Sequence, residues 1–264
     1  MSSSTFEGKV AVVTGAASGF GRGIAEHFAR EGVCVVLVDR DSEGLEKTYT
    51  ACKKTGFSEP LSLHKDLRHV STAKQIIDAT LEHTRGRIDI LVNSAGVSYF
   101  AAINTITQEE WDEVFEIDVR PLYFLSVAAA EAMDPSRGGR IINIGSNAGR
   151  KGRAMAAHYA AAKAAVANLT ESLALAYGKK NITVNTVCPA AVITKLWDAN
   201  FRGLLPITGK TREEHIETWA RMTPLGRLGT VEDIVDLVSF LASNKAGFIT
   251  AQAINICGGF MLTC

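Results

Sequence analysis

Residues 10–23 read Val10-Ala11-Val12-Val13-Thr14-Gly15-Ala16-Ala17-Ser18-Gly19-Phe20-Gly21-Arg22-Gly23. The first four form a continuous apolar run, which is typical of a strand buried on both faces of a parallel sheet. Residues 24–30 are expected to form a helix. A strand, a glycine-rich turn and a helix in this order present backbone N–H groups and a helix N-terminus to a phosphate group. The glycine spacing is Gly-x-x-x-Gly-x-Gly, not the commoner Gly-x-Gly-x-x-Gly, so its position after the first strand carries the prediction.

An acidic residue ends the second expected strand, residues 33–38. Asp39 lies about 20 residues beyond the glycines, where a carboxylate can bond both ribose hydroxyls of NAD and would repel the 2′-phosphate of NADP. Arg40 follows, and a guanidinium group at this position can instead bind a phosphate. The sequence favours NAD, because Asp39 takes the position nearest the ribose and Ser18 puts no basic residue in the glycine turn.

Strands and helices alternate along the rest of the chain. Further strands are expected at 61–63, 88–92, 140–145, 182–188 and 252–257, and helices at 42–55, 71–84, 111–133 and 231–241. Pro121 is expected to kink the long helix. Residues from about 190 to 225 are expected to be an irregular substrate loop with one short helix near 212–221. The alternation predicts one α/β domain over residues 1–264, a Rossmann-type doubly wound sheet of seven parallel strands with helices on both faces.

Polar residues follow five of these strands at their carboxyl ends. They are Thr14, Asp39, Asp66, Asn93 and Ser146. Because ligands of open α/β sheets bind outside the carboxyl ends of the strands, these side chains predict a single site at that edge.

A possible acid–base pair lies in the stretch after Ser146. Tyr159 and Lys163 are four residues apart, so in a helix both side chains leave the same face one turn apart. At ~4 Å and an effective dielectric constant of ~20, a phenolate and an ammonium group attract each other by roughly 4 kcal/mol. That attraction is expected to lower the pKa of Tyr159 toward neutrality, where a general acid–base group works best.

The bulk composition excludes several classes of partner. Lys plus Arg and Asp plus Glu are balanced at 28 each, which argues against a nucleic-acid or anionic-membrane surface. No apolar run approaches the ~18 residues that a membrane span needs. Five scattered cysteines without Cys-x-x-Cys spacing indicate a reduced, cytoplasmic protein. The six histidines form no ligand cluster, so no metal is expected in the chemistry.

The chain resembles the compact, soluble branch of the short-chain dehydrogenase/reductase family over nearly its whole length. The resemblance rests on the 14–21 glycine motif, Asp66, Asn93-Ser94-Ala95-Gly96, Ser146, Tyr159-x-x-x-Lys163, Pro189 and Thr194. It implies a nicotinamide cofactor and a homotetramer. It further implies that Tyr159 is the acid–base, that Lys163 lowers its pKa and holds the nicotinamide ribose, that Ser146 orients the substrate oxygen, and that Thr194 contacts the nicotinamide.

The residues expected to contact the cofactor are Gly15, Ser18, Gly19, Phe20, Gly21, Asp39, Arg40, Asp66, Leu67, Asn93, Ala95, Gly96, Tyr159, Lys163, Pro189, Val192 and Thr194. Two positions depart from the family pattern. Asp118 stands where the family usually has a catalytic asparagine whose backbone carbonyl holds a water leading to the lysine, and an aspartate can keep that carbonyl. Cys257 stands where the family commonly has Asp before the final Gly-Gly.

The substrate is expected to be a polyol, sugar alcohol or similar small secondary alcohol, because the tail of the chain resembles polyol dehydrogenases of this family. Basic residues at 150, 151, 153 and 195 support an alternative, an anionic hydroxy acid or hydroxysulfonate. A 3-oxoacyl reductase is a further alternative that Asp39 disfavours, since such enzymes prefer NADP. A non-catalytic NAD-binding protein would normally lose Tyr159 or Lys163, and this sequence has both, which argues against that class. Candidate substrate residues are Ser98, Asn147, Arg150, Arg153, His158 and Trp197, with Lys151 and Lys195 at the rim.

Overall fold

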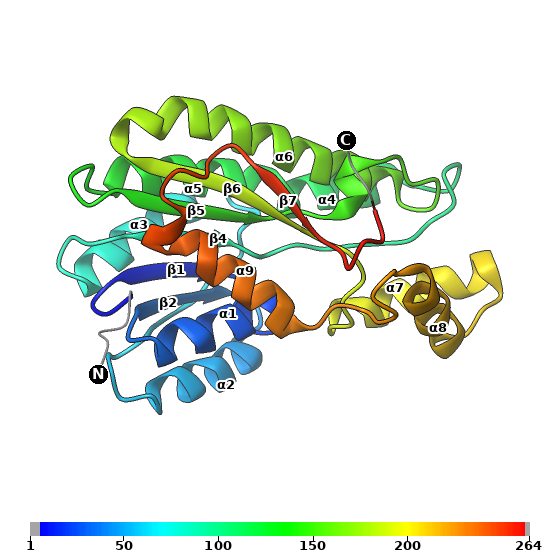
Figure 1. The fold of residues 1–264 in the computed structure, drawn as a ribbon, viewed down its shortest axis with the longest axis horizontal. Coiled ribbons are helices and arrows are strands. Elements are labelled where there is room, and N and C mark those ends of the chain that lie inside the picture. The colour runs from blue at the N-terminus through cyan, green and yellow to red at the C-terminus, as the bar shows by residue number, and fades with distance from the viewer. Residues whose placement is uncertain (1–5, 262–264) are drawn as a thin grey trace.

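Seven parallel strands form one sheet in the computed structural model, which describes residues 6–261 (Figure 1). The strands are β1 (Val10–Thr14), β2 (Cys34–Asp39), β3 (Leu61–His64), β4 (Ile90–Asn93), β5 (Gly139–Ile144), β6 (Ile182–Pro189) and β7 (Ala253–Ile256). Their order across the sheet is β3-β2-β1-β4-β5-β6-β7, so the winding reverses between β1 and β4. The predicted doubly wound fold is confirmed, and this reversal is where such sheets bind ligands.

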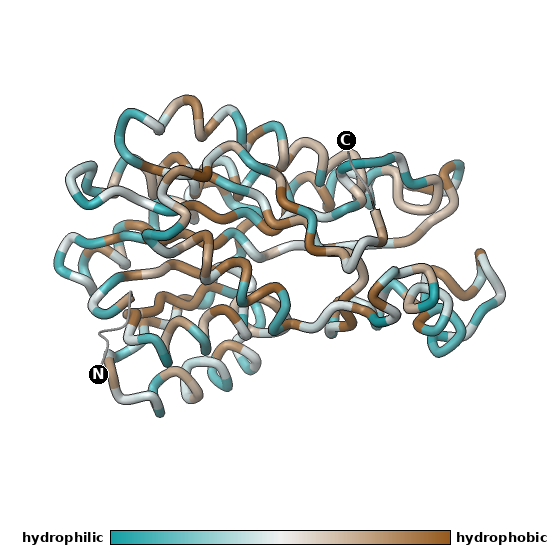
Figure 2. Tube along the Cα trace, viewed as in Figure 1, coloured by the Kyte–Doolittle hydropathy of each residue, from teal (hydrophilic) through white to brown (hydrophobic). Residues whose placement is uncertain are grey.

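Helices cover both faces of the sheet. One layer contains α1 (Gly19–Arg30), α2 (Ser42–Lys53) and α9 (Val231–Ala242), and the other contains α3 (Ser71–His83), α5 (Arg120–Ala132) and α6 (Ala157–Tyr177). Strand β1 feeds both layers, because Ala11 and Val13 enter one core cluster while Val12 enters the other. Figure 2 accordingly shows hydrophobic residues along the strands. Short 3₁₀ helices are η1 (Asn147–Arg150), η2 (Gly178–Lys180) and η3 (Asn244–Ala246).

The long helix expected at 111–133 is two helices. Helix α4 (Gln108–Asp118) begins earlier than expected, because Thr107 and Glu110 form a capping box. The chain leaves helical geometry at Val119, with φ −114° and ψ −59°, and α5 then starts with Pro121 in its first turn. A proline there lacks only an N–H that a helix start leaves unbonded anyway. Pro121 therefore begins a helix instead of kinking one, and Asp118 becomes the last residue of α4.

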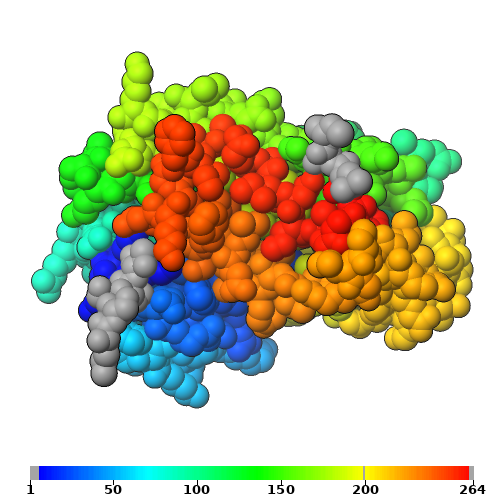
Figure 3. Space-filling model, viewed as in Figure 1, coloured from blue at the N-terminus to red at the C-terminus, as the bar shows by residue number. Residues whose placement is uncertain are grey.

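Residues 190–225 are not the irregular loop that the sequence suggested. They contain α7 (Leu196–Thr208) as well as α8 (Arg212–Met222), the short helix that was expected. Helix α7 is difficult to predict from the sequence because Gly203 and Pro206, two residue types with low helix propensity, lie inside it. Both helices extend beyond the end of the sheet, and in Figure 3 they form a lobe against the C-terminal segment. Within residues 6–261, no helix has the length and apolar character that a membrane crossing requires.

Candidate active site

Two adjoining cavities lie at the carboxyl ends of the strands. The glycine-turn cavity, of about 210 Å³, is lined by the turn after β1 and by the ends of β2, β3 and β4. The Tyr159 cavity, of about 460 Å³, is lined by the end of β5, the start of α6 and the α7–α8 segment. Both are lined by Phe20, Ser94, Gly96, Val97, Thr194 and Leu196. The arrangement can hold two molecules side by side, and the larger volume lies within the range of small-molecule sites.

The glycine turn is built so tightly that side chains would not fit. Gly15 has φ +67°, and a Cβ there would lie 2.9 Å from the Cα of Ala95, while a Cβ at Gly21 would overlap the Gly15 carbonyl. Thr14 holds the turn against the end of β4, because its Oγ1 accepts from the N–H groups of Ser94 and Ala95 at 3.0 and 3.1 Å. The first turn of α1 has no acidic residue and no side-chain cap from Ser18, so its N–H groups suit an anion.

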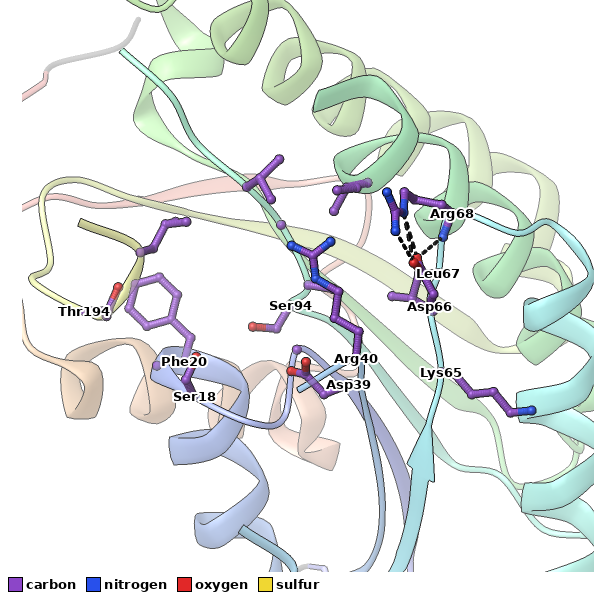
Figure 4. Close-up of a pocket in the computed structure, with 17 residues that line it drawn as sticks. Ser18, Phe20, Asp39, Arg40, Lys65, Asp66, Leu67, Arg68, Ser94 and Thr194 are labelled. Carbon is purple, nitrogen blue, oxygen red and sulfur yellow. Dashed lines mark hydrogen bonds and ion pairs between the residues drawn. The ribbon is translucent and has the colours of Figure 1, made fainter. Parts of the chain in front are cut away.

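Asp39 is fixed at the end of β2 by the backbone around it. Its Oδ2 accepts from the N–H of Ala17 at 3.0 Å, and its Oδ1 accepts from the N–H of Asp41 at 2.9 Å. Figure 4 shows the neighbouring Arg40 side chain extending across the cavity. A rigid carboxylate beside an anion-binding turn fits the ribose and phosphates of a dinucleotide.

Asp66, at the cavity wall beyond β3, is engaged by an arginine. Its Oδ2 accepts from Arg68 Nε at 2.9 Å, and this bonding lowers the pKa of Asp66 to about 2 (Figure 4). Lys65 points away from the cavity in Figure 4, and its Nζ donates to Gln75 Oε1 at 2.9 Å. The carboxylate of Asp66 is therefore ionised above strongly acidic pH and already neutralised by a neighbour.

Ser146, Tyr159 and Lys163 meet at the wall of the Tyr159 cavity. Ser146 follows β5 and caps η1, its Oγ accepting from the N–H of Ala148 at 3.0 Å. Tyr159 and Lys163 lie on successive turns of α6, with Lys163 Nζ 5.6 Å from the centroid of the Tyr159 ring. Lys163 Nζ also donates to the carbonyl of Ile144 at 3.0 Å. This set can move a proton at the tyrosine hydroxyl while the serine contacts the same oxygen of a bound molecule.

The electrostatic balance at Tyr159 differs from the sequence-based expectation. Burial raises the pKa of Tyr159; the Lys163 ammonium opposes this rise and the charge of Asp118 adds to it. For Lys163, burial acts to lower the pKa, but the negative charges of Asp118 and Tyr159 raise it overall. The expectation of a lowered tyrosine pKa counted the lysine alone. From the groups of this chain, the pKa of Tyr159 is raised instead.

Asp118 is buried, with 2% of the residue exposed, and forms an ion pair with Lys163. Its Oδ2 lies 3.0 Å from Lys163 Nζ, and its Oδ1 accepts from the N–H of Val97 at 2.7 Å. The carboxylate packs against Gly96, where a Cβ would lie 3.2 Å from Oδ2. At this position it is therefore the side chain that contacts the lysine.

Aromatic rings form much of the far wall of the Tyr159 cavity. Trp197 on α7 packs against Trp219 on α8 with centroids 4.9 Å apart, and against Phe100 at 6.1 Å. His215 stacks on Trp219 at 5.2 Å and bonds Thr208 Oγ1 through Nε2 at 2.9 Å. These contacts hold α7 and α8 together over the cavity.

Polar side chains also line this cavity, and those away from the catalytic set include Ser98, Asn147, Arg153 and Asn200. Arg153 donates to Asn147 Oδ1 at 3.4 Å and has no carboxylate within ion-pair distance among residues 6–261. Asn200 is 2% exposed, and its Oδ1 has no hydrogen-bond partner in the described part of the chain. Both groups are free to bond a polar molecule in the cavity.

Four of the expected site residues do not line either cavity. Gly21 lies behind the turn, and the Nδ2 of Asn93 instead donates to Ser126 on α5 at 3.0 Å and to Asn143 on β5 at 2.8 Å. Arg150 is exposed. His158 is fully buried, and burial lowers its pKa, so it is a neutral packing residue behind Tyr159. The remaining expected residues line one cavity or both.

Of the other basic residues suggested for the rim, Lys151 is solvent-exposed and Lys195 pairs with Asp41 at 3.3 Å. Cys188 also lines neither cavity; burial raises the pKa of its thiol. Cys257 is half-buried, and its Sγ donates to the Met261 carbonyl at 3.6 Å.

Several cavity-lining residues carried no signal in the sequence. They are Lys65, Arg68, Phe100, Met155, Asn200, His215, Thr223 and Phe260. Asn200 and His215 are unrecognisable without the two helices that orient them. Trp197, Leu204 and Trp219 line the apolar part of this cavity, whereas Leu205 and Met222 are exposed. In a helix over residues 196–208, Asn200 and Leu204 lie on the same face, since they are four residues apart.

Known proteins resemble this chain over nearly its whole length. Residues 15–261 match the family described as enoyl-(acyl carrier protein) reductase. Galactitol 2-dehydrogenase of Agrobacterium fabrum is 36% identical, covering 95% of this chain and 96% of that protein. A 3-oxoacyl-(acyl-carrier-protein) reductase of Pseudomonas aeruginosa is 35% identical, covering 98% and 100%. The crystal structure of a tryptophan variant of actinorhodin polyketide ketoreductase with NADPH superimposes with a TM-score of 0.89 at 32% identity, covering 96% and 97%.

Proposed function

The chain belongs to the short-chain dehydrogenase/reductase family, and we propose that it is an NAD-dependent dehydrogenase of a polyol, sugar alcohol or similar small hydroxylated compound. At the level of the family, it is an oxidoreductase that interconverts a secondary alcohol and a ketone with a nicotinamide cofactor. The observation that carries the proposal is the meeting of Ser146, Tyr159 and Lys163 in a cavity that adjoins the glycine-turn cavity.

The proposed mechanism assigns a role to each residue. A bound nicotinamide cofactor supplies hydride exchange at the substrate carbon. Tyr159 Oη takes the proton of the alcohol during oxidation and returns it during reduction. Ser146 donates a hydrogen bond to the same substrate oxygen, where negative charge develops. Lys163 stabilises the tyrosine anion from one helical turn away. Gly15, Gly19 and the start of α1 hold the phosphates, and Pro189, Val192 and Thr194 hold the nicotinamide end.

The preference for NAD is supported by the charge at the end of β2. Asp39 lines the glycine-turn cavity and is held by two backbone N–H groups, so its carboxylate cannot swing away from a 2′-phosphate. Arg40 offers a compensating positive charge on an exposed, longer side chain. The fixed group is expected to dominate, because moving a mobile cation into place costs side-chain entropy.

The polyol proposal is supported by similarity to galactitol 2-dehydrogenase and by separated polar groups on an aromatic wall. An anionic substrate is the second candidate. Arg153 favours it, because this half-buried guanidinium lines the cavity, donates to the neutral amide of Asn147 and forms no ion pair with any carboxylate in residues 6–261. A carboxylate or sulfonate would provide the missing charged partner. Enzymes that reduce 3-oxoacyl substrates usually prefer NADP, and Asp39 disfavours the binding of NADP.

The proposed acid–base role is tested by Tyr159→Phe. We expect kcat to fall by roughly 10²–10⁴-fold, because the proton can no longer be transferred at this position. Binding of NAD, measured by calorimetry, should remain within a few-fold of the unsubstituted enzyme. Ser172→Ala on the exposed side of α6 is the control for helix integrity. A Tyr159→Phe protein that folds, binds NAD and keeps near-full turnover would refute the assignment.

The substrate class is tested with a panel of polyols, hydroxy acids and hydroxysulfonates, followed by reduced nicotinamide absorbance. The proposal expects the highest kcat/KM on a polyol, with Arg153→Gln lowering it less than tenfold. Activity confined to anionic compounds, together with a loss of roughly 10–100-fold in Arg153→Gln, would establish the second candidate instead. Arg202→Gln, which removes an exposed arginine of α7, is the matched control.

The oligomeric state, the cellular location and the domain organisation are proposals as well. We propose a homotetramer, supported by exposed aromatic residues on α5 and α9, Tyr123, Phe124 and Phe240. We propose a cytoplasmic location, supported by the free state of the four described cysteines, with Cys264 outside the described residues. We also propose one domain over residues 1–264, in which residues 190–225 close over the substrate.

A further inference from the structure

The buried ion pair between Asp118 and Lys163 stands out against the rest of the charged groups. Every other pair described in residues 6–261 leaves more than a quarter of at least one side chain exposed, whereas here the exposed fractions are 0% and 6%. Two charges removed from water in this way cost desolvation free energy unless their geometry is close to ideal. The pair lies directly behind Tyr159, at the cavity where the proton is transferred.

The carboxylate of Asp118 is held at both oxygens. Oδ1 accepts from the N–H of Val97 at 2.7 Å, and Oδ2 lies 3.0 Å from Lys163 Nζ. Lys163 is in turn held by the carbonyl of Ile144 at 3.0 Å. The end of α4 and the end of β5 thus both contact the ammonium group, and the segment after β4 holds the carboxylate that pairs with it.

We propose that Asp118 is a positioning residue that fixes the Lys163 ammonium and offsets its charge, so that Tyr159 stays a phenol to higher pH than a neutral residue at position 118 would allow. The inference rests on the proposed role of Tyr159 as the acid–base. In the oxidation direction the phenolate is needed, so Asp118 shifts the working range to more alkaline pH. In the reduction direction the phenol is needed, so Asp118 extends activity upward in pH.

The charges around Tyr159 support this direction. From its own helix Lys163 favours the phenolate, while from α4 Asp118 disfavours it. Ser146, after β5, contributes a hydrogen bond that favours the phenolate. Cys188 in β6 is the remaining titratable group that acts on Tyr159, and burial raises the pKa of its thiol, so the thiol carries no charge near neutral pH. Burial raises the pKa of the Asp118 carboxyl, but the Lys163 ammonium and the Val97 N–H act in favour of its ionised form, and it is this negative charge that opposes phenolate formation.

The test is the ionisation of Tyr159 in Asp118→Asn, with Asp112→Asn on the exposed side of α4 as the charge-matched control. Tyrosinate formation in the cofactor-free enzyme is followed by ultraviolet difference spectroscopy, with Tyr159→Phe as the subtraction. The midpoint should fall by about one pH unit in Asp118→Asn and stay unchanged in Asp112→Asn. The rising limb of kcat/KM for alcohol oxidation should move in the same direction. An unmoved midpoint in folded Asp118→Asn overturns the proposal.

Two further measurements cover the case in which Asp118→Asn does not fold. Asp118→Ser also removes the charge, with a smaller side chain that fits the space, and should show the same downward shift. In the unsubstituted, cofactor-free enzyme, the midpoint of tyrosinate formation at Tyr159 should lie above that of an exposed tyrosine, and a midpoint below it would overturn the proposal without any variant. Failure of the underlying function is separate, because it appears as retained turnover in Tyr159→Phe.

Discussion

At the scale of single residues, Asp39 joins folding to cofactor choice. Its two oxygens accept the N–H groups of Ala17 and Asp41, so the same bonds that shape the turn also aim the negative charge at the glycine-turn cavity. A substitution that removes the charge but keeps an oxygen acceptor separates these two contributions. Asn at position 39 meets that condition, because its amide oxygen can still accept one of the N–H groups.

We therefore predict that Asp39→Asn raises the ratio of kcat/KM with NADP to kcat/KM with NAD by at least about tenfold, since the repulsion of the 2′-phosphate is removed. Steady-state kinetics with each cofactor at a fixed substrate concentration measures this ratio. Arg40→Gln is the companion variant and should lower the same ratio if the arginine approaches the phosphate. An Asp39→Asn enzyme with an unchanged ratio would assign cofactor choice to other residues.

The residues of the site differ in whether the sequence alone determines their positions. The positions of Tyr159 and Lys163 follow from a helical period of 3.6 residues, and Ser146 follows from the end of a strand, so all three were predictable. The ion pair of Lys163 with Asp118 was not, because it joins the last residue of α4 to the middle of a helix 45 positions later. The raised pKa of Tyr159 depends on that contact and on burial, and neither can be read from Tyr-x-x-x-Lys.

At the scale of elements, burial on both faces made the strands easy to recognise. All residues of β1, β4, β5 and β6 are buried, so their sequences are rich in apolar and β-branched residues, although β5 and β6 also bury polar side chains such as Asn143 and Asn185. Helix boundaries were less accurate, because they depend on caps. The capping box of Thr107 and Glu110 starts α4 three residues before Trp111, and the turn at Val119 separates α4 from α5. That separation places the carboxylate of Asp118 at a helix end facing Lys163.

At the scale of the whole molecule, the sheet explains why the position of the site could be predicted from the sequence although the residues of its α7–α8 wall could not. Parallel strands deliver their carboxyl ends to one edge, so Asp39, Asp66 and Ser146 converge whatever the details of packing. The α7–α8 segment has no such constraint. It lies in the long connection from β6 to β7, before the crossover helix α9, and its contribution to the Tyr159 cavity depends on contacts among Trp197, Trp219 and His215. Asn200 in the cavity wall was accordingly missed.

This division predicts that the α7–α8 segment opens independently of the sheet. In α8 only His215 is buried, and in α7 Leu204 is the one fully buried apolar side chain among the residues whose burial is described. Helix α2, of similar length, buries Leu45, Thr48 and Cys52 against the sheet and is the matched comparison. Because segments with few buried contacts open at a fraction of the global free energy of unfolding, amides of α7 and α8 should exchange at least about tenfold faster than those of α2.

Hydrogen exchange followed by mass spectrometry measures this difference in exchange rate. Saturating NAD together with substrate should reduce the difference by slowing exchange in α7. Equal protection of α7, α8 and α2 in the free enzyme would mean that the cavity wall is as rigid as the sheet, and that substrate must enter without movement of this segment.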